Sequence, residues 1–204
     1  MPKAFSEYEK EIIGKKLLEQ GYNLFSAYGL KKTNIEEIAN AAGISKGAFY
    51  NFYDSKEALF MDVIEEAEIR VRKELLAVID QPGPTPRARL LAVFQKAFGL
   101  FEAIPILKFL TGGDYDLLFR RVPAEKLQEH LVSDQAFFAE LVTRCRDVGI
   151  PILAPPDQIG GLLYPLVLTF MHEEDWVFGN FAGSMDMLLE LVAAFCLGEV
   201  EVQH

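Results

Sequence analysis

Apolar residues recur at helical spacing along nearly the whole chain, and no stretch of useful length alternates apolar and polar positions as a strand would. The pattern therefore predicts an all-α protein. Glycines at 29 and 43 and a proline-rich stretch at 81–86 separate the helices. The predicted helices span residues 7–28, 34–42, 45–51, 55–80, 87–103, 105–112, 115–121, 123–148, 157–172 and 184–197.

The stretch 33–60 has the pattern of two short helices joined by a tight turn. Thr33 and Glu36 have the spacing of a capping box, which predicts that a helix begins at residue 34. Gly43 provides the left-handed conformation that a tight turn after a helix needs. Ser45 then caps a second short helix. Two short helices with this connection form a helix-turn-helix unit.

Longer helices flank this unit on both sides. Ser6 with Glu9, and Asp54 with Glu57, have capping-box spacing and predict where these helices begin. The helix that opens at Ser55 runs to about residue 80, so it passes from the helix-turn-helix region into the rest of the chain. We expect it to transmit movement between the two parts.

The second short helix is suited to the major groove of DNA, because its side chains are small or bond to phosphates and base edges. Gly47 and Ala48 permit a close backbone approach, and the Asn51 amide matches an adenine edge. Lysines neutralise phosphates, and hydroxyls bond to them. The predicted DNA-binding residues are Thr33, Ser45, Lys46, Gly47, Ala48, Tyr50, Asn51 and Lys56. A purely structural helical hairpin is the alternative.

The run IANAAGISKGAFYNFYDSKEALF resembles the N-terminal DNA-binding domain of TetR/AcrR-type transcriptional regulators, and the resemblance covers roughly residues 6–65. It implies a three-helix DNA-binding domain, here residues 1–54, followed by a helical-bundle effector-binding and dimerisation domain, here 55–204. It also implies a ligand-responsive regulator, a repressor. The chain departs from the family at Phe52 and Tyr53, where a polar aromatic residue and then Phe are usual.

The last two predicted helices are too apolar for a monomer surface. They read IGGLLYPLVLTFMH and SMDMLLELVAAFCLG, and exposing both would leave a patch well beyond a few hundred Å². Pairing with the same helices of a second copy covers them and gives a homodimer. A two-fold dimer implies a palindromic DNA site. The alternative is that these helices belong to the core.

Aromatic residues gather in the middle of the second domain and predict a pocket for a small, mainly apolar or aromatic effector, cationic in view of the acidic chain. We expect the effector to act through the helix from Ser55 and release DNA. An effector-independent structural DNA-binding protein is the alternative. The candidate ligand-binding residues are Phe98, Phe101, Phe109, Tyr115, Phe137, Tyr164, His172 and Trp176.

A net charge of −10 is unusual for a DNA-binding protein, but its distribution removes much of the conflict. Residues 1–60 contain eight lysines and eight acidic residues, so the rest of the chain carries the whole excess. An acidic body repels DNA and orients the neutral part toward it.

The sequence has neither a predicted membrane span nor a predicted signal peptide, and both observations concern the cellular compartment. No uncharged apolar run of about eighteen residues predicts a membrane span, and the first residues contain no apolar signal core. We therefore expect a cytoplasmic protein in which Cys145 and Cys196 are free thiols.

Nothing in the sequence has the spacing of an enzyme's reactive groups. There is no phosphate-cradling glycine loop, no paired-cysteine metal motif and no His-x-x-x-His pair, and the three histidines are scattered. The sequence therefore predicts no catalytic residue, no metal ligand and no cofactor, and it predicts double-stranded DNA, an effector and a second copy as the partners.

Overall fold

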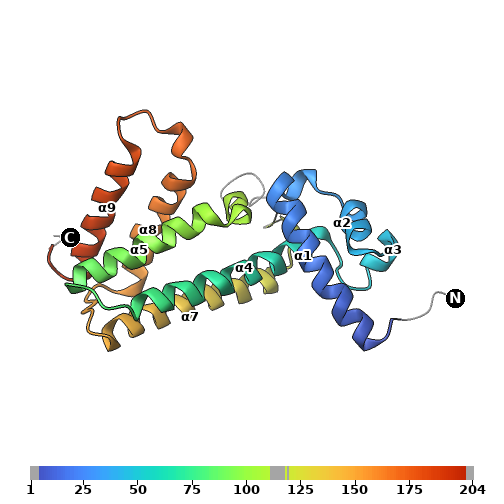
Figure 1. Cartoon of the computed structure of the whole chain (residues 1–204), viewed down its shortest axis with the longest axis horizontal. Helices are drawn as coiled ribbons and strands as arrows, with labels where there is room; N and C mark the ends of the chain where they lie inside the picture. The colour runs from blue at the N-terminus through green and yellow to red at the C-terminus, as the bar shows by residue number, and fades with distance from the viewer. Residues whose placement is uncertain (1–4, 111–117, 119, 201–204) are drawn as a thin grey trace. The chain divides into compact units, whose positions relative to one another are not determined.

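A computed structural model of the chain describes residues 5–110, 118 and 120–200. Every regular element among these residues is helical, which confirms the predicted all-α class (Figure 1). The elements are α1 (Glu7–Lys32), α2 (Ile35–Ala42), α3 (Lys46–Phe49), α4 (Lys56–Ile79), α5 (Pro86–Ala103), η1 (Pro105–Leu110), α7 (Ala124–Asp147), α8 (Pro156–Met171), η2 (Glu173–Asp175) and α9 (Phe181–Cys196).

The helices form two compact units. The first unit runs to Ile69, within α4, and also takes in the segment Ile104–Leu127. The second unit consists of Arg70–Ala103 and the chain from Gln128 onward. Helix α4 therefore contributes its first part to one unit and its last part to the other.

Helix α1 begins where the sequence predicts, but it continues past the predicted end at residue 28, as far as Lys32. The Ser6 side chain accepts a hydrogen bond from the Glu9 backbone, and the Glu9 carboxylate accepts one from the Ser6 backbone. Gly29 has a φ of 76° and interrupts the helical geometry. The buried face of α1 meets α4, where the rings of Phe25 and Phe60 lie 5.0 Å apart, edge to face.

Helix α2 starts one residue later than predicted, because the capping box is formed by Asn34 and Glu37. The expected box of Thr33 and Glu36 is wrong. Thr33 belongs to the end of α1, where its hydroxyl donates to the Gly29 carbonyl oxygen at 2.8 Å. Only one of the two overlapping box patterns can form, since Thr33 already has this other partner.

The start of α4 also differs by one residue from the predicted capping pattern. The Ser55 hydroxyl oxygen accepts a hydrogen bond from the Ala58 backbone at 3.1 Å, so Ser55 is the capping residue. The expected box of Asp54 and Glu57 is therefore wrong. The long helix that it was meant to open is present as α4.

Helix α9 begins three residues before the predicted start at Ser184. The Asn180 side chain accepts a hydrogen bond from the Gly183 backbone at 3.2 Å and so caps the helix earlier. The helix packs against both α5 and α8 within the second unit. The predicted helical turn at 115–121 falls mostly outside the described residues.

Arg89, near the start of α5, joins the carboxyl ends of two other helices in the second unit. Its guanidinium donates to the Ile79 carbonyl at the end of α4, at 3.0 Å, and to the Val148 carbonyl just after α7, at 2.7 Å. A third bond reaches the Gln81 carbonyl at 3.2 Å. One side chain thus satisfies carbonyls that helix ends leave without partners.

The two cysteines of the second unit are buried and unbridged. Burial raises the pKa of Cys145 to about 11 and the pKa of Cys196 to about 12. Both thiols are therefore protonated near neutral pH, and the expectation of free thiols is confirmed. Among the described residues, no helix is long and apolar enough to cross a membrane.

Candidate nucleic-acid interface

Helix α3 presents one uncovered face and is anchored by the other. The Ser45 hydroxyl oxygen accepts a hydrogen bond from the Ala48 backbone at 3.2 Å and starts the helix. Phe49 is fully buried. Lys46, Gly47 and the residue after the helix, Tyr50, are exposed. Ser45 and Asn51 are exposed as well, and Ala48 is half-buried, so these six predicted DNA-binding residues are accessible at least in part.

The anchor behind α3 is an aromatic cluster that reaches α4. The Phe49 ring lies 5.7 Å from the ring of Tyr50 and 5.9 Å from the ring of Tyr53. The Tyr53 hydroxyl is hydrogen-bonded to Asp62 of α4, and Lys126 forms an ion pair with the same carboxylate. Burial first, and then the charge of Asp62, raise the pKa of Tyr53, so its hydroxyl stays protonated. Tyr53 therefore packs inside the protein, where it connects Phe49 of α3 to Asp62 of α4.

Phe52 packs against Phe5, which lies two residues before the start of α1. Its ring centroid lies 5.8 Å from that of Phe5, and both side chains are half-buried. A hydroxyl at position 52 is not needed for this contact.

Two of the eight predicted DNA-binding residues are engaged inside the protein. Thr33 is only 1% exposed, and its hydroxyl bonds to the Gly29 carbonyl, so the expected phosphate contact is wrong. The Lys56 ammonium, half-buried, donates to the carbonyls of Leu30 and Thr33 at 2.6 Å and 2.7 Å. The structure thus places this ammonium on the protein's own backbone.

Asn34 was not among the predicted residues, although it lies exposed at the amino end of α2, next in sequence to the predicted Thr33. The signal that could have found it is its own capping pattern with Glu37, which overlaps the pattern of Thr33 and Glu36.

Residues 17–63 match the family described as bacterial regulatory proteins, tetR family. Over 59 residues the chain is 39% identical to the uncharacterized HTH-type transcriptional regulator YdgC of Bacillus subtilis (strain 168), which covers 29% of this chain and 30% of YdgC. The chain thus matches YdgC over less than a third of that relative's length. Over 170 residues it is 39% identical to the HTH-type transcriptional repressor KstR2 of Rhodococcus jostii (strain RHA1), which covers 79% of this chain and 75% of KstR2. The chain belongs to the TetR family.

The TetR-family fold extends to solved structures of low sequence identity. The transcriptional regulator FadR from Bacillus subtilis, in complex with stearoyl-CoA, superposes with a TM-score of 0.61 at 17% identity. The alignment covers 92% of this chain and 99% of that one. The relatives named here are all described as transcriptional regulators.

The described part of this TetR-family protein would leave room for a side chain at position 47, where the chain has glycine. A Cβ added there would meet only the Ser45 hydroxyl oxygen, at 3.9 Å, which is ordinary contact. Glycine within a helix is destabilising by about 0.5–1 kcal/mol relative to alanine. Glycine at this exposed helix position lowers stability without relieving a contact inside the protein. Its presence is consistent with a close approach of DNA to the backbone.

We expect Gly47→Ala to raise the free energy of unfolding by about 0.5–1 kcal/mol, because alanine favours the helix. We expect the same substitution to weaken DNA binding, because the added methyl group would separate the helix backbone from the DNA. Gly14→Ala on α1 is the matched control, since a Cβ there meets nothing within 4 Å. It should stabilise the protein similarly without changing DNA affinity. Thermal unfolding and fluorescence anisotropy measure the two effects, and equal affinities for both variants would contradict the prediction.

The predicted ligand-binding residues of this TetR-family protein are only partly brought together. Phe98 is buried, and its ring lies 5.2 Å from that of Phe170. Phe170 lies 6.2 Å from Phe181, which lies 5.5 Å from Trp176. Two predicted residues, Phe98 and Trp176, therefore belong to one aromatic cluster. The sequence did not single out the two phenylalanines that connect them.

The other predicted ligand-binding residues have separate surroundings. Phe137 lies under the Arg72 guanidinium, 5.1 Å from its ring centroid. Tyr164 is 58% exposed, and His172 is exposed with Asp175 at 3.7 Å. Phe101 is half-buried. The side chains of Phe109 and Tyr115 lie outside the described residues.

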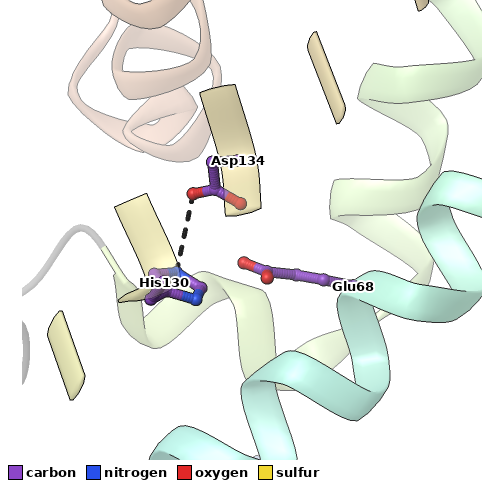
Figure 2. Close-up of side chains that lie close together, drawn as sticks. All are labelled: Glu68, His130 and Asp134. Carbon is purple, nitrogen blue, oxygen red and sulfur yellow. Dashed lines mark ion pairs between the residues drawn. The ribbon is translucent and has the colours of Figure 1, made fainter. Parts of the chain in front are cut away.

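A hollow of about 440 Å³ lies between α7 and α8, and none of the predicted ligand-binding residues whose side chains are described lines it. Asp134, on one wall, is held in place by its neighbours: His130 lies 3.6 Å away, one turn earlier on α7 (Figure 2), and Arg72 bonds to it at 2.7 Å. The remaining lining residues are Gln135, Phe138, Pro156, Asp157 and Gly160.

Proposed function

We propose that this TetR-family regulator is a repressor that binds a palindromic operator as a homodimer and is released by a small effector. Residues 1–54 read the DNA, and residues 55–204 bind the effector and form the dimer. The observation that carries the proposal is the uncovered face of α3, held from behind by the fully buried Phe49. The chain is similar to most of the repressor KstR2, which supports repression rather than activation.

The apolar surface of the last two helices supports the dimer. In α8 the only buried residue is Ile159, although the helix is mostly apolar. Leu162 on α8, and Met187 and Leu191 on α9, are 41%, 66% and 56% exposed. A second copy covers such a surface, and two-fold symmetry then sets two recognition helices roughly 34–36 Å apart, one DNA turn.

The second unit offers aromatic side chains to an apolar effector, as the cluster of Phe98, Phe170, Phe181 and Trp176 illustrates. The stearoyl-CoA bound to the Bacillus subtilis FadR supports an effector with a long apolar part. Helix α4 continues from one unit into the other and is the covalent route for the signal. The effector shifts the equilibrium only by its difference in affinity for the two states.

A two-stage experiment tests this function. The purified protein first selects duplexes from a random-sequence pool, and we expect a palindrome with half-sites about 10 base pairs apart, bound by two chains in sedimentation. The selected duplex is then titrated with a panel of apolar and aromatic compounds that includes stearoyl-CoA. At least one compound that binds should weaken the complex. Selection of no sequence would contradict operator binding, and tight ligands without effect on DNA affinity would contradict the switch.

A further inference from the structure

Lys56 opens α4, but its ammonium group lies on the turn between α1 and α2. It donates hydrogen bonds to the carbonyl oxygens of Leu30 at 2.6 Å and Thr33 at 2.7 Å, and to that of Lys31 at 3.4 Å. An ammonium group has three donors, and here three acceptors surround it. The contact joins positions 23 to 26 residues apart in the sequence, all within the first unit.

The electrostatics of the two helices agree with this placement. A cation in the first turn of a helix faces the positive end of that helix's dipole, which disfavours Lys56 where it stands in α4. The carbonyls of Leu30 and Lys31 lie at the end of α1, beyond the interruption at Gly29, and the end of a helix leaves carbonyl groups without a partner in the helix. The lysine of α4 thus completes the end of α1.

We infer that Lys56 is a positioning residue for DNA binding, which holds the α1–α2 turn, residues 30–34, against α4 and does not contact phosphate. The inference rests on the proposed operator binding. The turn carries the exposed Lys31 and Lys32, and it leads directly into the α2 cap at Asn34. Helix α2 in turn packs on α3. The position of these groups relative to α3 therefore depends on a bond made from α4.

The salt dependence of binding separates positioning from phosphate contact. Each phosphate that a cation neutralises contributes about 0.9 to the slope of log affinity against log salt concentration. We expect Lys56→Met, which keeps the alkyl stem, to bind the selected duplex about tenfold more weakly at every salt concentration with an unchanged slope. Lys46→Met, on the exposed face of α3, should instead make the slope shallower by about 0.9 for each phosphate that Lys46 neutralises.

Two outcomes with Lys56→Met would overturn the inference: a slope reduced as in Lys46→Met, or wild-type affinity. Lys56→Arg decides the matter if Lys56→Met does not fold by circular dichroism. Arginine keeps the charge, but its longer, planar group does not fit three carbonyls around one nitrogen. We expect weaker binding with the wild-type slope, whereas a phosphate contact would tolerate arginine at full affinity.

Amide hydrogen exchange gives a readout that needs no DNA. We expect residues 30–34 to exchange faster in Lys56→Met, or in Lys56→Arg if that is the variant that folds, than in the wild type. Residues of the second unit should be unchanged. Unchanged exchange at 30–34 would overturn the inference even if the wild-type protein selected no duplex. The failure of operator binding and the failure of the positioning role are thereby distinguished.

Discussion

Replacing Phe49 with alanine should lower the free energy of unfolding of the first unit by about 3–5 kcal/mol, the range for a buried phenylalanine. The side chain is fully buried and contacts the rings of Tyr50 and Tyr53. Among the four residues of α3, Phe49 is the buried one. DNA binding should be lost together with the fold of this region. Chemical denaturation followed by circular dichroism measures the change in stability.

The neighbouring aromatic residue is the matched control for this substitution. Tyr50 is 50% exposed, so Tyr50→Ala should change the free energy of unfolding by less than about 1 kcal/mol. It should nevertheless weaken DNA binding, because the side chain lies on the exposed face of α3. If Phe49→Ala proves as stable as the wild type, or if Tyr50→Ala binds DNA normally, the assignment of the two faces of α3 is wrong.

Arg89→Ala should lower the free energy of unfolding of the second unit by about 2–4 kcal/mol, because hydrogen bonds from a charged donor contribute about 1.5–3 kcal/mol each and water replaces part of the loss. Its guanidinium bonds to the carbonyls of Ile79, Gln81 and Val148. Removing it leaves the ends of α4 and α7 without this connection. Urea denaturation of the full chain, followed by circular dichroism, measures the change.

Arg87, two residues earlier on α5, provides the comparison. It forms ion pairs with Glu190 at 2.8 Å and Glu199 at 2.9 Å, and its side chain is 40% exposed. Exposed ion pairs contribute about 0–1 kcal/mol, so Arg87→Ala should have a small effect that high salt reduces further. Equal losses for the two variants would show that bonding to the helix ends is not what makes Arg89 important.

Local sequence signals predicted the helix-turn-helix region well. Gly43 has a φ of 78° and ends α2, as the turn required. The capping residues of α2 and α4 are each shifted by one residue from the predicted ones, and the cause at α2 can be named. Thr33 and Asn34 each have a glutamate three residues later, so the sequence offers two capping boxes that cannot be ranked locally. The fold selects Asn34 because the Thr33 hydroxyl is bonded to the end of α1.

The remaining features depend on contacts that no local pattern contains. The Lys56 ammonium meets carbonyls more than twenty residues away, so a lysine expected to bind phosphate cannot be recognised from its neighbours as an internal one. The whole chain is 50% hydrophobic and contains sixteen phenylalanines, so the sequence offers too many candidates for the lining of a pocket. Which aromatic rings meet is decided by helix packing.

The shortness of α3 limits how its recognition surface can be reused. A helix of four residues that contains a glycine is far below the length of about 12–15 residues at which isolated helices become even marginally stable in water. A synthetic peptide that copies residues 45–51 would therefore be a random coil. Moving this DNA-binding surface to another protein would therefore require all three helices, α1 to α3, together with the aromatic cluster of Phe49 and Tyr53 that packs against α3.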